Sequence, residues 1–108
     1  MSPSRREKIE AMLAEDSGDT FLRYSLALEL EKEGAHQESL ERLDSLVKDQ
    51  PPYVPAFFMA AQQLAKLARV AEARSILRDG VEEARRQGDG HAAGEMAEFL
   101  ASLGAAGE

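Results

Sequence analysis

Residues 20–53 read TFLRYSLALELEKEGAHQESLERLDSLVKDQPPY, and residues 54–87 read VPAFFMAAQQLAKLARVAEARSILRDGVEEARRQ. Each segment is 34 residues long, and similar residues occupy equivalent positions in the two. The matched pairs are Ala27 with Ala61, Leu30 with Leu64, Lys32 with Lys66, Glu38 with Glu72, Leu43 with Leu77, Val47 with Val81 and Tyr24 with Phe58. A repeat of this period indicates units that each bury an apolar face against the next unit.

Helix-period patterns cover most of the chain, and Gly and Pro interrupt them at regular points. The patterns predict helices over residues 5–15, 20–33, 36–48, 54–67, 70–86 and 89–103. Ser4 and Glu7 form a capping-box pattern before the first helix, and Asp19 and Asp89 are candidate caps of later helices. Gly34 can supply the left-handed residue that ends the second helix, whereas alanine stands at the equivalent position 68.

The repeat resembles the tetratricopeptide repeat (TPR), a 34-residue helix–turn–helix unit with small residues where its two helices touch. When Gly34 is placed at the turn between the helices, Leu26 and Ala27 occupy the large–small pair of the family, and Ser39 occupies its small position in the second helix. The corresponding residues of the second unit are Ala60, Ala61 and Ala73. The chain departs from the family at Arg23, which takes an aromatic position, and at Arg85, which replaces the closing proline.

The resemblance implies an all-α fold, a short right-handed TPR solenoid of about six antiparallel helices, as in a small bacterial-type TPR domain. Residues 5–104 are then a single domain. Its expected parts are a half repeat (5–18), repeat 1 (20–53), repeat 2 (54–87) and a C-terminal capping helix (89–103). Residues 1–4 and 105–108 are expected to be frayed termini.

Composition narrows the classes of function. The chain has no cysteine, which excludes disulfides and thiolate metal sites, and its formal net charge of -7 disfavours nucleic acid as a partner. No apolar run is long enough to cross a membrane, and the N-terminus lacks the apolar core of a secretory signal, so we expect a cytoplasmic protein.

Signatures of catalysis are absent from the sequence. It contains no glycine-rich phosphate loop, no zinc-binding His-Glu-x-x-His and no calcium loop. The two histidines, His36 and His91, stand beside turn residues and are interpreted as solvated. We therefore expect a non-enzymatic protein without a cofactor or a bound metal.

The resemblance implies that the first helix of each unit lines the concave face of the solenoid. With a 3.6-residue period, these helices have a second stripe of apolar residues beside the stripe that faces the core. The last helix can extend this second stripe. The groove candidates are Phe21, Tyr24, Leu28, Lys32, Phe58, Met59, Gln62, Lys66 and Met96, with Gln63 as a further residue at the rim.

Aromatic and methionine side chains offer large and adaptable contact area, which suits a protein-binding groove. The expected function is therefore a protein–protein interaction module that binds a peptide or protein segment, extended or helical, on the concave face. Two alternatives remain open at this point. The terminal helix can cover these residues, or a second copy of the chain can cover them in a homodimer that uses this face or an end of the solenoid.

Overall fold

The computed structural model describes residues 2–107, with 105–107 described as backbone only. Within this part of the chain there are six α-helices and no strand, so the prediction of an all-α fold is confirmed. The helices are α1 (Arg5–Glu15), α2 (Thr20–Lys32), α3 (His36–Val47), α4 (Val54–Lys66), α5 (Val70–Arg86) and α6 (Gly90–Gly107).

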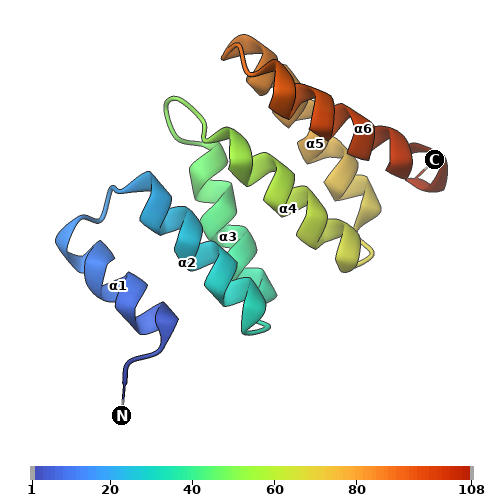
Figure 1. Cartoon of the computed structure of the whole chain (residues 1–108). Helices are drawn as coiled ribbons and strands as arrows, with labels where there is room; N and C mark the ends of the chain where they lie inside the picture. Colours follow the sequence, from blue (N-terminus) through green and yellow to red (C-terminus); the bar gives the residue numbers. More distant parts are fainter. Residues whose placement is uncertain (1, 108) are drawn as a thin grey trace.

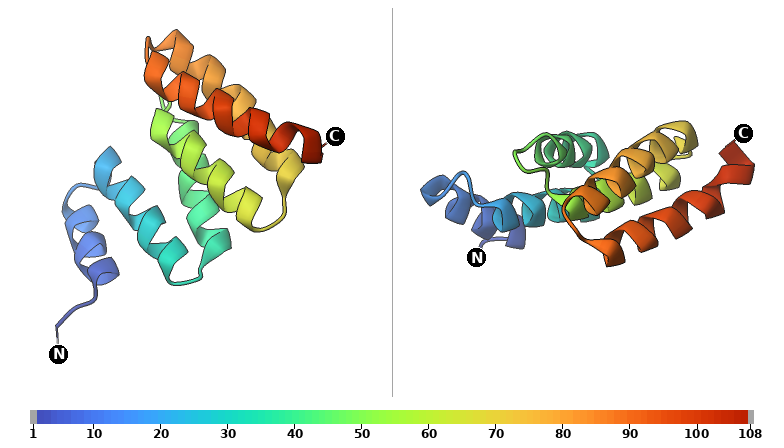
Figure 2. Two further views of the ribbon diagram at one scale, coloured as in Figure 1. Left: turned by 45° about the vertical axis from the view of Figure 1, so that its right-hand side comes forward. Right: turned by 90° about the horizontal axis from the view of Figure 1, so that it is seen from above.

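The helices form an elongated stack (Figure 1). Each one packs against the next along the chain, and α6 also touches α4. The molecule measures 48 × 30 × 19 Å along its principal axes. Seen from above, α3 and α6 lie on opposite sides of the stack (Figure 2). The termini are far apart because no later helix folds back onto α1 (Figure 1).

Side-chain caps begin three of the helices. Ser4 and Glu7 form the predicted capping box of α1, with Glu7 N to Ser4 Oγ at 3.1 Å and Ser4 N to Glu7 Oε1 at 2.8 Å. Asp19 accepts from Leu22 N at 2.9 Å, and Asp89 accepts from Ala92 N at 3.0 Å. These bonds satisfy amide groups that have no partner inside the helix.

Three turns share one geometry at the helix C-termini. Gly34, Ala68 and Gly88 have positive φ angles of 84°, 62° and 78°. In each case the next residue donates its amide to a carbonyl five positions earlier: Ala35 to Leu30 at 2.9 Å, Arg69 to Leu64 at 2.8 Å and Asp89 to Ala84 at 2.8 Å. Ala68 thus adopts the left-handed conformation that Gly34 adopts at the equivalent position, although alanine adopts it less readily than glycine.

Equivalent positions of the two 34-residue segments are buried alike. Ala27 and Ala61 are fully buried, Leu43 and Leu77 are fully buried, and Ser39 is as buried as Ala73. The core is divided along the stack into three groups centred on Ile9, on Leu43 and on Phe57. Each group contains residues from neighbouring helices, so the apolar faces are buried by stacking.

Two features of the packing depend on individual residues. The guanidinium of Arg23 in α2 binds Asp49 through two hydrogen bonds, of 2.6 and 3.2 Å, and Ser45 through one of 2.9 Å. Gly80 in α5 lies so close to α4 and α6 that a Cβ atom there would approach Phe57 Cβ and Met96 Sδ to 2.7 Å.

The last helix is longer than predicted. It continues to Gly107, whereas the sequence predicted an end near residue 103 and a frayed tail. Three alanines among residues 101–106, and no proline, favour this continuation. Residues 2–4 precede α1 without helical structure, and the remaining predicted frayed residues, 1 and 108, lie outside the described part of the chain.

Candidate functional site

A pocket of about 220 Å³ lies between α2, α4 and α6. Its lining residues are Tyr24, Val54, Pro55, Phe58, Met59, Gln62, Asp89, Ala92, Glu95 and Met96. Five of the nine groove candidates therefore meet in one place: Tyr24, Phe58, Met59, Gln62 and Met96. We call this the α2/α4/α6 pocket.

Helix α4 supplies the centre of the pocket. Pro55, Phe58, Met59 and Gln62 follow the i, i+3, i+4, i+7 spacing that places residues on one helix face. The opposite face of α4 is buried in the core. These four side chains therefore extend from one helix, and the core holds that helix in place.

Tyr24 forms the wall contributed by α2. Its ring meets that of Tyr53 edge-on, with 5.3 Å between the ring centroids and 67° between the planes. Burial raises the pKa of the Tyr24 phenol above its ordinary value of 10.0, and Tyr53 adds to the effect. Among the described residues the Tyr24 hydroxyl has no hydrogen-bond partner, so it stays available to a bound group.

The last helix forms the third wall and does not close the pocket. Phe99 of α6 packs against Phe58, with 5.9 Å between the ring centroids. Met96, which was predicted to extend an accessible row, is instead fully buried. Its side chain fills the space above Gly80, so it belongs to the core and forms only the base of the pocket.

The other groove candidates lie outside the pocket. Phe21 is 69% exposed on α2, and Leu28 is half-buried. Lys32 pairs with Glu29 at 3.2 Å, and Lys66 is exposed at the end of α4. These positions are on the predicted helices, but the structure does not bring them to the lining of the α2/α4/α6 pocket.

Gln63 was expected at the rim but is buried, with only 2% of its surface exposed. It lies one residue, or about 100°, away from Gln62 on the helix and therefore faces the core. Its Nε2 donates to Ser39 Oγ at 3.1 Å.

Two acidic residues of the pocket were not predicted. Asp89 caps α6 at one edge, and Glu95 lies beside His91 at 3.4 Å, with both side chains largely exposed. The signal that points to Glu95 is its position next to Met96 on the last helix. These carboxylates give the pocket a negative rim around an apolar centre.

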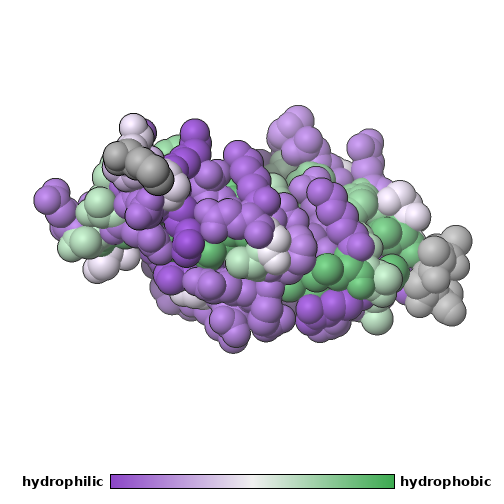
Figure 3. All heavy atoms as spheres, turned by 90° about the horizontal axis from the view of Figure 1, so that it is seen from below, coloured by the Kyte–Doolittle hydropathy of each residue, from purple (hydrophilic) through white to green (hydrophobic). Residues whose placement is uncertain are grey.

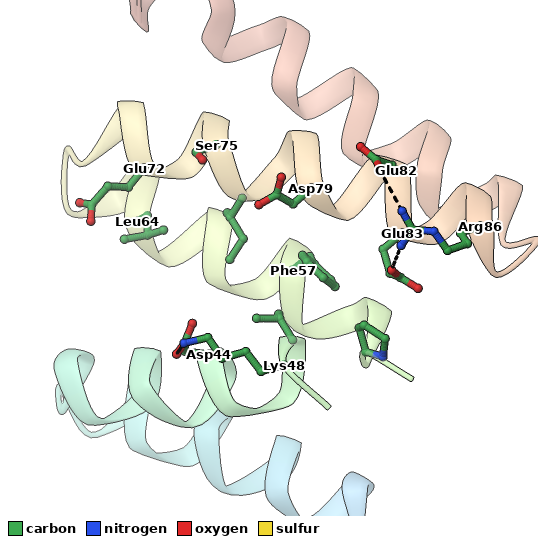
Figure 4. A pocket seen from close by; sticks show the side chains of 13 residues that line it. Asp44, Lys48, Phe57, Leu64, Glu72, Ser75, Asp79, Glu82, Glu83 and Arg86 are labelled. Carbon is green, nitrogen blue, oxygen red and sulfur yellow. Dashed lines mark hydrogen bonds and ion pairs between the residues drawn. The ribbon is translucent and has the colours of Figure 1, made fainter. Parts of the chain in front are cut away.

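A second and larger hollow, of about 610 Å³, lies between α3 and α5 (Figure 4). Figure 4 shows Asp44 and Lys48 on the α3 side, Glu72 and Asp79 on the α5 side, and Phe57 and Leu64 of α4 between them. A neighbouring hollow of about 310 Å³ shares four lining residues with it, namely Asp44, Leu64, Glu72 and Ile76. We call the two together the α3/α5 groove, which was not predicted from the sequence.

Two classes of feature are absent from the described residues. Within 2–107, no three His, Asp or Glu side chains converge as a metal site would require. None of the helices in this part of the chain has both the length and the apolar character that spanning a membrane needs.

Comparison with known proteins adds a likeness of fold. No family model matches the chain, and no curated protein matches it. Among solved structures, the chain is similar to the solution structure of protein BPP2914 from Bordetella parapertussis, a structural genomics target. The TM-score is 0.80 at 25% sequence identity, and the match covers 95% of this chain and 90% of the other. The six-helix arrangement is thus similar to a fold seen in solution over nearly its whole length.

Proposed function

We propose that the chain is a short TPR-type solenoid that binds a segment of another protein in the α2/α4/α6 pocket. The matched burial of positions 34 residues apart supports the repeat assignment, as does the shared turn geometry at Gly34 and Ala68. In this assignment α2, α4 and α6 are the first helices of successive units, and they line the same side of the stack.

One observation carries the proposal: side chains from three separate helices converge on a surface pocket with an apolar centre and polar groups at its edge. Phe58 and Met59 provide contact area, while Gln62 and the Tyr24 hydroxyl can hydrogen-bond a backbone. With about 220 Å³, the pocket can accept one or two apolar side chains of a bound segment, but it is too small to enclose a typical small-molecule ligand.

A peptide library tests the proposal. Peptides are selected from a random library on the wild-type protein, and their affinities are measured by calorimetry against two matched variants. Met59→Lys places a charge in the pocket, whereas Met12→Lys changes a residue of α1 that is 50% exposed and far along the stack. We expect Met59→Lys to weaken binding by about tenfold or more and Met12→Lys to leave it unchanged.

Three results decide the test. Selective loss with Met59→Lys supports the pocket as the binding site. Equal effects of the two variants, or no enriched peptide, contradict the proposal. Circular dichroism spectra of both variants must match that of the wild type, because an unfolded variant would lose binding for a different reason.

Self-association is a second candidate function. Seen from below, most of the surface is hydrophilic, but apolar side chains gather toward the C-terminal end of the stack (Figure 3). Leu67 at the α4–α5 turn is 38% exposed, and Leu100 and Leu103 of α6 are half-buried. A homodimer through this end would double the mass from 11.8 kDa in light scattering at high concentration, whereas a constant mass would exclude it.

A further inference from the structure

The α3/α5 groove combines an apolar floor with charged walls. Phe57 and Leu64 of α4 form the floor, and both are more than nine-tenths buried. Val47 and Ile76, which are half-buried, line the floor from α3 and α5. Apolar side chains that are reachable along a groove of this kind can receive the apolar face of a bound segment.

Charge is segregated across α5. This helix contains four carboxylates (Glu72, Asp79, Glu82, Glu83) and four arginines (Arg74, Arg78, Arg85, Arg86), so its sequence is neutral. All four carboxylates line the α3/α5 groove, but of the four arginines of α5 the lining includes Arg86 alone. Arg78 and Arg85 line a different hollow, which faces α6.

The whole groove is therefore acidic. Its walls carry six carboxylates, from Glu41, Asp44, Glu72, Asp79, Glu82 and Glu83, against three cations, Lys48, Arg69 and Arg86. Each cation already pairs with a carboxylate of the groove: Lys48 with Asp44 at 2.8 Å, Arg69 with Glu72 at 2.5 Å, and Arg86 with Glu82 at 2.9 Å and with Glu83.

Two carboxylates of the groove have no cationic partner. Within the described part of the chain, neither Glu41 nor Asp79 pairs with a Lys, Arg or His side chain. Asp79 lies midway along α5, between Glu72 and Glu82, and lines the groove (Figure 4). Unpaired carboxylates beside an apolar floor favour a cationic occupant, because its Lys or Arg side chains can pair with them without breaking an existing ion pair of the groove.

The length of the groove fits a helical segment. Its α5 wall runs from Glu72 to Arg86, which is about 21 Å at 1.5 Å per residue. A helix of about 14 residues covers the same distance. A second copy of this chain is a poor occupant, because its net charge of -7 has the same sign as the groove.

We propose that the α3/α5 groove is a second docking surface that binds a cationic amphipathic helix of a partner protein. The apolar face of that helix packs on Val47 and Ile76, above the buried Phe57 and Leu64, and its Lys or Arg side chains pair with Asp79 and Glu41. This surface lies outside the α2/α4/α6 pocket and does not depend on the function proposed for that pocket.

The test uses a fluorescent 14-residue helical peptide of Leu, Ala and Lys, with Leu on one face and Lys on the other. Binding to the 108-residue chain is followed by fluorescence anisotropy. We expect the Lys peptide to bind, a peptide with Glu in place of Lys not to bind, and affinity to fall as salt is raised. A scrambled Lys peptide without an apolar face should bind more weakly than the amphipathic one.

Matched variants locate the binding site. Asp79→Lys and Glu98→Lys change the net charge equally, and both residues are exposed and unpaired among the described residues, but Glu98 lines neither the groove nor the pocket. We expect Asp79→Lys to weaken binding by at least about fivefold and Glu98→Lys to change it by less than about twofold. Met59→Lys should have no more effect than Glu98→Lys, which separates this groove from the other pocket.

Three outcomes would overturn the inference. Equal losses with Asp79→Lys and Glu98→Lys would mean that the peptide follows net charge alone. Weakened binding to the Met59→Lys variant, with unchanged binding to Asp79→Lys, would show that the peptide binds in the α2/α4/α6 pocket. Failure of the amphipathic Lys peptide to bind the wild-type protein would remove the docking surface altogether.

Discussion

Gln63 donates a hydrogen bond to Ser39 across the stack, with 3.1 Å between Nε2 and Oγ. Ser39 in turn donates to the carbonyl of Ala27 at 2.6 Å, so one buried chain of hydrogen bonds links α2, α3 and α4. At the positions 34 residues further on, Ala73 replaces Ser39 and Ala97 replaces Gln63. The next junction of the stack thus contains apolar side chains where this one contains a polar link.

The Ser39 hydroxyl should contribute measurably to the free energy of unfolding. Ser39→Ala removes both hydrogen bonds and leaves Gln63 Nε2 unpaired in the core, while the Ala27 carbonyl keeps only its bond within α2, so we expect a loss of about 1–3 kcal/mol in urea unfolding. Ser75→Ala, at an exposed hydroxyl of α5, should change the free energy of unfolding by less than about 0.5 kcal/mol.

A double-mutant cycle separates the hydrogen bond from packing. Replacing both partners, in Ser39→Ala with Gln63→Leu, should cost less than the sum of the single substitutions, because no polar group is then left without a partner. Additive costs would mean that the two side chains do not stabilise each other.

Gly80 should not tolerate a methyl group. A Cβ there would lie 2.7 Å from both Phe57 Cβ and Met96 Sδ, so Gly80→Ala should destabilise the protein by about 1–3 kcal/mol despite the higher helix propensity of alanine. Gly94 in α6 has no atom within 4 Å of the same position, and Gly94→Ala should therefore stabilise it by about 0.5–1 kcal/mol. Thermal unfolding of both variants measures the difference, and a stabilised Gly80→Ala would show that α4, α5 and α6 are less closely packed.

The turn at Ala68 should gain from glycine. Because alanine is strained at a φ of 62°, Ala68→Gly should raise the free energy of unfolding by about 1 kcal/mol. The reverse change at the equivalent turn, Gly34→Ala, should lower it by about the same amount. Chemical denaturation tests both, and two changes of the same sign would contradict the shared turn geometry.

Tyr24 should make the fold sensitive to alkali. Its pKa is raised in the folded state because burial opposes the phenolate, so its contribution to stability is complete below the ordinary pKa and is lost as pH rises through the folded value. The Tyr53→Phe variant keeps Tyr24 as its one tyrosine, and its absorbance titration should have a midpoint above 10.0. In Tyr24→Phe the fall of stability above pH 10 should be smaller than in the wild type. A midpoint at or below the ordinary value would show that the phenol is solvated.

Local signals in the sequence account for most helix boundaries. The bounds of α1 and α5 agree with the prediction, and α2, α3 and α4 each end one residue earlier than predicted. These ends depend on caps, prolines and positive-φ turns, which act within a few residues. The end of α6 was missed because the sequence after residue 103 contains both glycine and alanine. Glycine disfavours a helix and alanine favours one, so these residues do not indicate where the helix ends.

Properties set by distant contacts were less accessible to prediction. The spacing on α4 grouped Phe58, Met59, Gln62 and Lys66 on one face, since one helix fixes their relative directions; the first three line one pocket, and Lys66 does not. It did not show that Met96 is buried, because that depends on how α6 lies over Gly80. The α3/α5 groove was missed for the same reason, since residues about 35 positions apart form its two walls.

The stacking of each helix on its predecessor bears on how the chain folds during synthesis. Every helix from α2 to α6 packs against the helix that precedes it in the sequence, and that helix has already left the ribosome when the next one emerges. Closing each contact costs little loop entropy, because the intervening segments are short. The polypeptide can therefore assemble vectorially from its N-terminus, one hairpin at a time, without waiting for its C-terminal residues.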